Sequence, residues 1–518
     1  MVLLLILAGS VMRFVDLDRM PVWHDEAFSA LRVFGHDKRN LFERLYSGDL
    51  LRATELQAFQ HEAPELGWPD TLRALRLHPE HSPLYYAFAR LLGGVMESLL
   101  LALRGAAALF GVLLAPAMFW LARELFGSGR TPWITAALAA GSPLFLLYAQ
   151  EAREYALWLA AMAGGSAALL RALRLERRRD WALYAFLVTV GLYSHLLFAL
   201  LLPVHGTTLY GTLGNDPARL KRALPAWLST VGIGLLLFSP WLYQLLAGAE
   251  RVRLYTAWMA RAQPPASLFA AWGRHLTHLF VDLPTLPPAA AWAVALLLVW
   301  AMWRCLSTAP RRAQWFLWPL LAVSVATVLA PDLLLGGSRS LHARYLLPTL
   351  LAVLMMVAQA IAGTWGSPAR WKERTAGTAF ALLLALGAWS DLEILRADTW
   401  WTKYFSSANA EVAQIINASP HPLIVVSHHG VAPGEMLSLS YYLDQRVRVW
   451  GEPGHGADRI PGGFASLFLL TPSEPLRAML QSDYQLQPLA GTWQWFRAVP
   501  RQSGTAPKAL SADSPRND

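Results

Sequence analysis

The sequence has little cysteine and little charge. One cysteine, Cys305, occurs in 518 residues, which excludes an intramolecular disulfide and a metal cluster built on several thiolates. Charged residues make up 15% of the chain, whereas soluble domains carry roughly 25%. Apolar residues make up 55%, and the mean hydropathy is +0.33. This composition excludes a disordered chain and argues against a soluble enzyme.

Tryptophan and basic residues, by contrast, are abundant. The chain contains 23 Trp residues, a residue type that gathers at the two interfaces of a bilayer. The net charge is +9, which in a soluble protein would suggest a nucleic-acid partner. Here the basic residues are divided among five short connections, so we expect contact with membrane lipids and no nucleic acid.

Apolar runs that approach the roughly 20 residues needed to cross a bilayer recur along the chain. We therefore predict a polytopic α-helical membrane protein with about eleven transmembrane helices. The predicted spans cover residues 1–15, 99–121, 132–148, 155–173, 181–193, 196–213, 224–246, 289–303, 315–330, 345–362 and 375–389. The first run lacks a basic leader and a small-residue cleavage site, so we expect a retained helix and not a signal peptide.

The orientation follows from the connections between spans. The connections at 123–130, 171–179, 219–222, 304–312 and 370–374 are short and basic, and they alternate with connections of mixed or acidic charge. Basic loops remain in the cytoplasm. We therefore expect a multi-pass protein of the inner cell membrane with its N-terminus in the cytoplasm and its C-terminal domain outside.

We expect a membrane domain at residues 1–391, an extracytoplasmic α/β domain at 392–500 and a disordered tail at 501–518. A large first outer loop, 16–97, and a second, 247–288, interrupt the membrane domain. Helices are predicted in the first loop at 26–32, 41–46 and 71–77, and residues 83–94 form either an interfacial helix or a twelfth span. In the α/β domain we predict strands at 423–427, 447–449 and 466–470, and helices at 411–417, 435–442 and 475–480.

Two clusters in the first outer loop carry candidate chemistry. Asp25 and Glu26 are adjacent, so one carboxylate can act as a general base and the other as its electrostatic partner. The alternative is a helix start, with Asp25 as N-cap and Glu26 in the first turn. Glu80 and His81 precede Pro83 at another helix start. They either bind a phosphate or a metal or form a solvated cap.

Two further clusters lie between predicted spans on the outer side. Glu151 and Arg153 either face a water-filled cavity or pair as a structural cap. Arg339 and Arg344 are basic residues on an outer loop, which favours anion binding over interfacial snorkelling. Weaker candidates are Arg104 and His195, which we expect to be helix–helix contacts, and the pair His428-His429, for which we expect a loop role and not a metal site.

These four clusters resemble the motifs of a known family. Asp25-Glu26, the run His81-Ser82-Pro83-Leu84-Tyr85-Tyr86, the run from Tyr148 to Tyr155, and Ala343-Arg344-Tyr345-Leu346-Leu347-Pro348 look like the integral-membrane GT-C glycosyltransferases. Those enzymes are related to protein O-mannosyltransferases (glycosyltransferase family 39) and to the aminoarabinose transferase that modifies lipid A. The resemblance covers roughly residues 1–390. Many members have Pro at the position of Ser82.

The resemblance implies a GT-C-like fold and a sugar donor linked to polyprenyl phosphate, since nucleotide sugars are absent outside the membrane. It implies Asp25 as the base, with Glu26 or Glu80 as its neighbour. Asp25 and Glu80 are then candidates for sharing a divalent cation, and no other cofactor is expected. Residues implied to bind the substrate are Glu80, His81, Tyr85, Glu151, Arg153, Arg339 and Arg344, among which His81, Arg153 and Arg344 hold the phosphate.

The leading hypothesis is thus a glycosyltransferase that moves a sugar onto an envelope lipid, glycan or protein. One alternative is a transporter or flippase of lipid-linked sugars. The large outer loop with its carboxylates, and the lack of an inverted repeat, argue against it. A second alternative is a non-catalytic subunit of an envelope-glycan assembly. The presence of Asp25 argues against this alternative.

Overall fold

The fold was obtained as a computed structural model, which describes residues 2–96, 98–286, 288–365, 367–428, 430–453 and 459–501. The chain divides into two compact units. The helical unit comprises the described residues of Met1–Leu17, Arg76–Val95 and Leu101–Arg396. The sheet unit comprises those of Asp18–Leu75, Met96–Leu100 and Ala397–Asp518.

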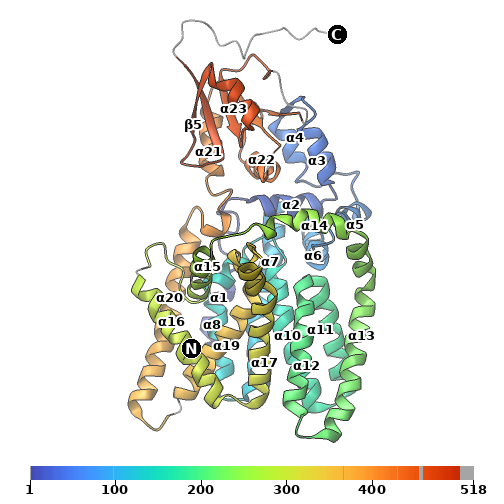
Figure 1. Cartoon of the computed structure of the whole chain (residues 1–518), viewed down its shortest axis with the longest axis vertical. Coiled ribbons are helices and arrows are strands. Elements are labelled where there is room, and N and C mark those ends of the chain that lie inside the picture. Colours follow the sequence, from blue (N-terminus) through green and yellow to red (C-terminus); the bar gives the residue numbers. More distant parts are fainter. Residues whose placement is uncertain are drawn as a thin grey trace. The chain divides into compact units, whose positions relative to one another are not determined.

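The helical unit consists mainly of long apolar helices (Figure 1). Its helices are α1 (Val2–Met12), α6 (Leu84–Gly93), α7 (Leu99–Phe126), α8 (Thr131–Ala140), α9 (Pro143–Ala149), α10 (Tyr155–Leu175), α11 (Arg178–Ser194), α12 (Leu201–Leu213), α13 (Pro217–Ala247), α14 (Ala249–Thr256), α15 (Pro265–His278), α16 (Pro288–Thr308), α17 (Arg311–Ser324), α18 (Ala330–Leu334), α19 (Leu347–Trp365) and α20 (Arg370–Arg396). The 3₁₀ turns η1 (Leu196–Leu200) and η5 (Ala343–Leu346) lead into α12 and α19.

Seven helices among the described residues are long and apolar enough to cross a membrane. The pair α8 and α9, bent by 57° at residues 141–142, forms an eighth if it is one broken span. The predicted spans at 1–15, 181–193 and 289–303 also lie on helices: α1 has 11 residues, α11 has 17, and the apolar stretch described in α16 runs from Trp292 to Thr308. The multi-pass helical fold is therefore confirmed, and the count of eleven stays a prediction.

Two helices lie at the centre of the helical unit. In the most apolar stretch of α10, 89% of the residues are buried, and in that of the span containing α19, 78% are buried. In the corresponding stretch of α13 only 22% are buried. Small residues also allow close packing elsewhere in this unit, as at Gly191 of α11, where an added Cβ would meet the ring of Phe198 at 2.2 Å. The helix α6 has ten residues, or about 15 Å, which favours the interfacial helix over the twelfth span.

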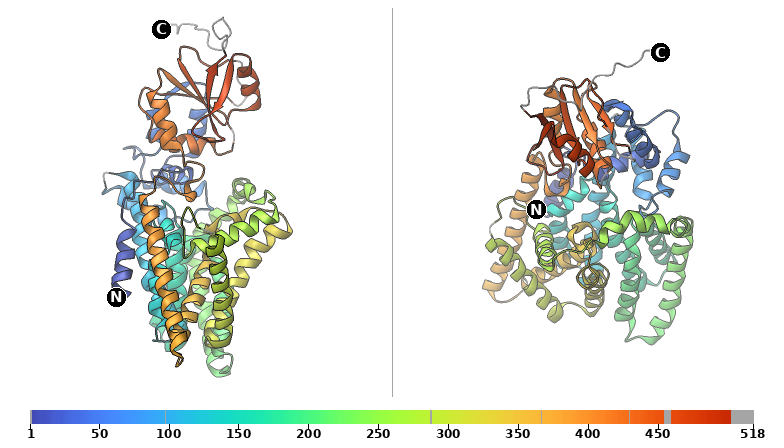
Figure 2. Two further views of the ribbon diagram at one scale, coloured as in Figure 1. Left: turned by 90° about the vertical axis from the view of Figure 1, so that its left-hand side faces the viewer. Right: turned by 45° about the horizontal axis from the view of Figure 1, so that its top comes forward.

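In the sheet unit, the described strands form one six-stranded sheet in the order β1-β3-β2-β4-β6-β5 (Figure 2). The strands are β1 (Leu50–Arg52), β2 (Pro422–Val426), β3 (Arg448–Gly451), β4 (Ser466–Leu470), β5 (Tyr484–Pro488) and β6 (Trp495–Pro500). The central strands β3, β2 and β4 are parallel, and the outer pairs are antiparallel. The helices are α2 (His24–Val33), α3 (Lys38–Leu45), α4 (Ala53–Ala58), α5 (Trp68–Arg76), α21 (Asn409–Ala418), α22 (Ala432–Ser440) and α23 (Glu474–Gln481).

Both faces of this sheet are covered. Alternate residues of a strand point to opposite faces. Ile424 and Val426 accordingly pack in a core with residues of α2, α3, α4, α21 and α22, whereas Leu423 and Val425 pack in a second core with α23. Every residue of β2 is buried, which explains its continuous apolar sequence.

The first outer loop contributes to the sheet unit, which differs from the expected boundaries. We predicted an α/β domain made only of residues 392–500, but Asp18–Leu75 belongs to the same unit and supplies β1, which pairs with β3. The predicted ranges 423–427, 447–449 and 466–470 match β2, β3 and β4, while β1, β5 and β6 were not predicted. All but the first residue of the tail predicted at 501–518 lies outside the described residues.

This joint core generates a prediction about β1. Leu51 has no exposed surface and packs in the core shared by the two segments, whereas its neighbour Leu50 is 43% exposed. Leu51→Ala should destabilise the sheet unit by about 2–5 kcal/mol because it leaves a cavity, while Leu50→Ala should have little effect. Thermal unfolding of the purified full chain measures both. Equal shifts in the two variants would show that β1 is not part of the core.

Candidate active site

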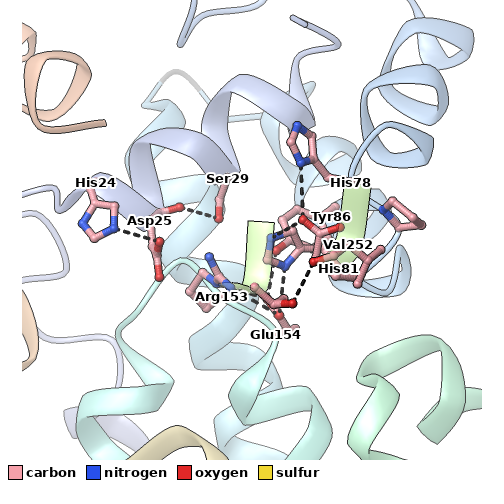
Figure 3. Close-up of polar contacts among 12 residues, drawn as sticks. His24, Asp25, Ser29, His78, His81, Tyr86, Arg153, Glu154 and Val252 are labelled. Atoms are coloured by element: carbon pink, nitrogen blue, oxygen red, sulfur yellow. Dashed lines mark hydrogen bonds and ion pairs between the residues drawn. The ribbon is translucent and has the colours of Figure 1, made fainter. Parts of the chain in front are cut away.

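The helical unit contains a buried carboxylate surrounded by cationic and polar groups. Glu154 is 2% exposed and precedes α10. Its Oε2 lies 3.2 Å from Arg153 Nε and accepts a hydrogen bond of 2.9 Å from the Tyr86 hydroxyl. Its Oε1 lies 3.7 Å from His81 Nδ1. Figure 3 shows these side chains converging on Glu154.

The loops that carry this cluster are fixed by hydrogen bonds from their side chains to the backbone of neighbouring segments. Pro143 starts α9, and the helix ends at Ala149, so residues 150–154 form a tight turn before α10. Gln150 ties this turn to α1, since its Nε2 donates to the carbonyl oxygens of Met12 (3.2 Å) and Val15 (2.9 Å). The turn therefore presents Arg153 and Glu154 at a defined place.

The second loop, before α6, is similarly fixed. Ser82, which stands where many family members have Pro, is buried, and its hydroxyl donates to the carbonyl oxygen of Leu192 in α11 at 3.1 Å. Glu80 Oε1 lies 3.3 Å from His78 Nδ1 and 3.9 Å from His81 Nε2. His81 is thus flanked by Glu80 and Glu154.

His195 lies close enough to the Glu154 cluster and to Arg344 for their charges to affect its pKa. The His195 ring stacks on Trp158 at 4.1 Å. Burial lowers the pKa of His195 to about 4; the positive charges of Arg153, His81 and Arg344 act in the same direction, and the negative charge of Glu154 opposes them. Charged groups from three of the four predicted clusters, at His81, Arg153 and Arg344, therefore lie near His195 in the helical unit.

Glu154 remains ionised in this setting. Burial alone would raise its pKa, but the Arg153 charge and the hydrogen bond from His81 hold the pKa of Glu154 well below its usual range. A charged carboxylate fixed beside a guanidinium and an imidazole holds these cationic groups in place before any substrate arrives.

The remaining candidates of the helical unit have partners within the fold. The Tyr85 hydroxyl donates to the carbonyl oxygen of Leu103 at 2.8 Å, and Glu151 is buried in the turn before α10. Arg339 Nη1 lies 3.0 Å from Asp332 Oδ1. We now expect Arg339 to stabilise its own loop. Arg104 donates to the carbonyl oxygen of Leu17 at 2.6 Å, a contact that fixes the backbone after α1.

Asp25 and Glu26 belong to the sheet unit, at the start of α2. The helix begins at His24 with Trp23 as N-cap, so Asp25 is not the N-cap. Glu26 is buried, and its Oε2 lies 2.9 Å from Lys403 Nζ and accepts from the Trp23 backbone N–H at 3.3 Å. Asp25 is 22% exposed at its side chain, and its Oδ1 lies 3.2 Å from His24 Nε2.

The suggested metal sites receive no support from ligand geometry. Among the described residues, no group of three or more His, Cys, Asp or Glu side chains is arranged to hold a metal ion. Asp25 and Glu80, the suggested pair, belong to different units, and a shared cation stays a prediction. His428 packs its ring against Phe42 and Tyr46, and His429 lies outside the described residues.

Sequence reasoning missed Glu154, Tyr86 and His195 as members of the cluster. Glu154 stands in the same motif as Arg153, but the prediction chose Glu151 as the acidic partner. The available signal was position, because an acid directly before a long apolar helix must be paired if it is buried. Tyr86 adjoins Tyr85, and only the helical register shows which hydroxyl reaches the carboxylate.

The Glu154 cluster leads to a prediction with a defined pH dependence. Glu154→Gln leaves the buried Arg153 charge uncompensated and should cost about 3 kcal/mol of stability. Because the pKa of Glu154 is lowered in the folded state, this loss should be full above about pH 4.5, the ordinary value, and shrink as the pH falls below it.

Thermal unfolding of the two proteins across pH measures the effect. Glu176→Gln is the matched control, since Glu176 pairs with Arg219 and Arg222 at the surface and should contribute at most about 1 kcal/mol. A Glu154 variant as stable as the wild-type protein at pH 7 would contradict the assignment.

Comparison with known proteins finds a family model that matches part of the chain. Residues 80–244 match the family model described as dolichyl-phosphate-mannose-protein mannosyltransferase, a stretch that contains His81, Arg153 and Glu154. No curated protein matches the sequence.

Two solved structures of ArnT from Cupriavidus metallidurans share the fold along nearly the whole chain. The one bound to undecaprenyl phosphate has a TM-score of 0.53 and 14% identity, and the alignment covers 98% of this chain and 99% of that one. The apo structure has a TM-score of 0.52 and 13% identity, covering 96% and 97%. This chain is therefore similar to the GT-C glycosyltransferases over residues 80–244, and it shares the multi-pass helical fold of ArnT.

Proposed function

We propose that the protein transfers a sugar from a polyprenyl-phosphate donor to an envelope acceptor on the outer face of the inner membrane. The observation that carries this proposal is the cluster around Glu154, in which the guanidinium of Arg153 and the imidazole of His81 are held at the end of an apolar helix. A lipid-linked phosphate needs such cationic donors beside an apolar surface. An ArnT of the same fold has been solved with undecaprenyl phosphate bound.

Two guanidiniums serve the leaving phosphate in this proposal. Arg153 is fixed by Glu154, and Arg344, which lies in the 3₁₀ turn η5 before α19, has its charge near His195, as Arg153 does. When the bond between the anomeric carbon and the phosphate oxygen breaks, that oxygen takes the electron pair and its charge increases. Donors already aimed at the oxygen stabilise this charge without reorganising.

The acceptor supplies the hydroxyl that attacks the anomeric carbon. Its oxygen forms the new glycosidic bond, and its proton passes to a base, for which we propose Asp25. Of the two adjacent carboxylates, Asp25 is the accessible one, since Glu26 is buried against Lys403. Glu26 then serves to anchor the start of α2. An envelope lipid, glycan or protein supplies the attacking hydroxyl.

The test of this proposal is turnover with defined donors. The purified full chain, reconstituted with envelope membranes as the source of acceptor, is given a panel of undecaprenyl-phosphate sugars, and the release of undecaprenyl phosphate is measured. We expect release with at least one sugar of the panel. No release with any of them would contradict the proposed donor class.

The same assay tests the base. Asp25→Asn keeps the volume of the side chain but cannot accept a proton, so turnover should fall by roughly 10²–10⁴. Asp37→Asn is the control, because Asp37 caps α3 by accepting from the Arg39 backbone N–H and Asn caps a helix as well as Asp. Full turnover in Asp25→Asn would identify Asp25 as a merely structural residue.

The phosphate role of Arg344 has its own matched pair. Arg344→Lys keeps the charge but loses the planar fork, so binding of undecaprenyl phosphate should weaken by roughly 10-fold while thermal stability changes little. Arg339→Lys, five residues away, should leave the affinity unchanged because Arg339 pairs with Asp332. Affinity loss in Arg339→Lys but not in Arg344→Lys would reverse the two assignments.

A further inference from the structure

Asp25 is one end of a chain of three polar side chains within the sheet unit. His24 Nε2 lies 3.2 Å from Asp25 Oδ1, a contact drawn in Figure 3, and His24 Nδ1 lies 3.5 Å from Glu435 Oε1. The imidazole therefore stands between two carboxylates. Asp25 is partly accessible, whereas Glu435, on α22, has no exposed side-chain surface.

The Glu435 carboxylate is held by specific hydrogen bonds. Its Oε1 accepts from the Ser406 hydroxyl at 2.7 Å, and its Oε2 accepts from Asn409 Nδ2 at 3.2 Å. Asn409 Nδ2 also donates to the Ser438 hydroxyl at 2.8 Å, and that hydroxyl donates to the carbonyl oxygen of Val22. The network thus extends from α22 to the backbone just before α2.

The His24 ring is fixed on its other sides. It forms edge contacts with the rings of Trp23 and Phe405, with centroids 4.8 and 5.2 Å away, and its backbone N–H donates to the Ser406 hydroxyl. Gly434 allows α22 to come this close, since an added Cβ would lie 2.9 Å from His24 Cβ. Gly434, the residue before Glu435, therefore lies directly against His24, the residue before Asp25.

Packing alone does not explain a carboxylate in this position. Burial raises the pKa of Glu435, which means that its charge destabilises the fold; the nearby imidazole and the two hydrogen bonds offset part of this cost. An apolar residue of similar volume is often neutral or stabilising in place of a buried charge. A buried carboxylate behind an imidazole is, in contrast, the arrangement that fixes the orientation of a catalytic side chain.

We propose that Glu435 is a positioning residue, which acts through His24 to hold the Asp25 carboxylate in its reactive orientation. The C-terminal part of the chain then contributes directly to the reaction and does not only complete the fold. This inference rests on the proposed function of Asp25 as the base.

The first test compares two buried carboxylates of the sheet unit. Glu435→Gln keeps the side-chain volume but removes the charge facing His24. Glu452→Gln is the control, since Glu452 is also buried but bonds to Ser473. In the undecaprenyl-phosphate release assay, Glu435→Gln should lower turnover roughly 10-fold, part of the 10²–10⁴ that a general base contributes. Affinity for undecaprenyl phosphate should be unchanged in both variants, and turnover unchanged in Glu452→Gln.

The second test asks whether Glu435 acts through His24. His24→Gln keeps an amide near Asp25 but cannot reach Glu435 at the same time, so its turnover should fall by a similar factor. The effects of substitutions in one chain of contacts do not add. Adding Glu435→Gln to His24→Gln should therefore cause little further loss of turnover. Equal fold-losses from Glu435→Gln in the two backgrounds would overturn the proposal, as would full turnover in either single variant.

These outcomes remain separate from those that concern the proposed function. If Asp25→Asn abolishes turnover and Glu435→Gln does not, the positioning role fails and the base remains. If Asp25→Asn retains full turnover, the base assignment itself fails. If Glu435→Gln does not fold, the test uses His24→Gln alone, since His24 lies at a partly exposed helix start. Unchanged turnover in His24→Gln then overturns the proposal.

Discussion

A charge removed from water must be matched by an opposite charge or by hydrogen bonds, and this requirement organises the helical unit. Glu154 is buried at the start of α10, and its partners come from two loops about seventy residues apart. Tyr86 and His81 lie in or before α6, and Arg153 lies in the turn after α9. The apolar helices supply rigid supports, and the carboxylate determines which of their ends meet.

The sheet unit obeys the same rule with residues that are still further apart. The buried ion pair of Glu26 with Lys403 and the contact of His24 with Glu435 both join the first outer loop to the C-terminal segment. The shared apolar core and the pairing of β1 with β3 make the same connection without charge. A domain that looks like a C-terminal appendage in the sequence is therefore completed by residues near the N-terminus.

The predictable part of this structure is the part that apolar patterning determines. A run of about twenty apolar residues has few alternatives to a helix, and every predicted span falls on helical segments, although residues 132–148 are divided between α8 and α9. The buried strands β2 and β4 were predicted for the same reason. In contrast, β1 has three residues and is specified only by its partner, and β6 does not alternate between apolar and polar residues.

The candidate site was predictable as a set of motifs but not as a set of contacts. The family-like pattern singled out the regions of His81, Arg153 and Arg344. It did not distinguish Glu151 from Glu154, since the two residues have the same chemistry a few residues apart. The contacts of Glu154 with Arg153 and His81 separate them.

Glu154 and Glu435 are buried carboxylates, one in each unit, whose environments shift the pKa in opposite directions. Arg153 and His81 hold the pKa of Glu154 well below its usual range, whereas burial raises that of Glu435. A permanent anion suits the centre of a cationic cradle, because it keeps guanidinium and imidazole groups in place without titrating. A carboxylate whose charge is costly suits a place behind an imidazole, where any increase of positive charge on the ring is stabilised. Environments that shift the pKa values of two carboxyl groups in opposite directions allow the same kind of side chain to take different roles in one protein.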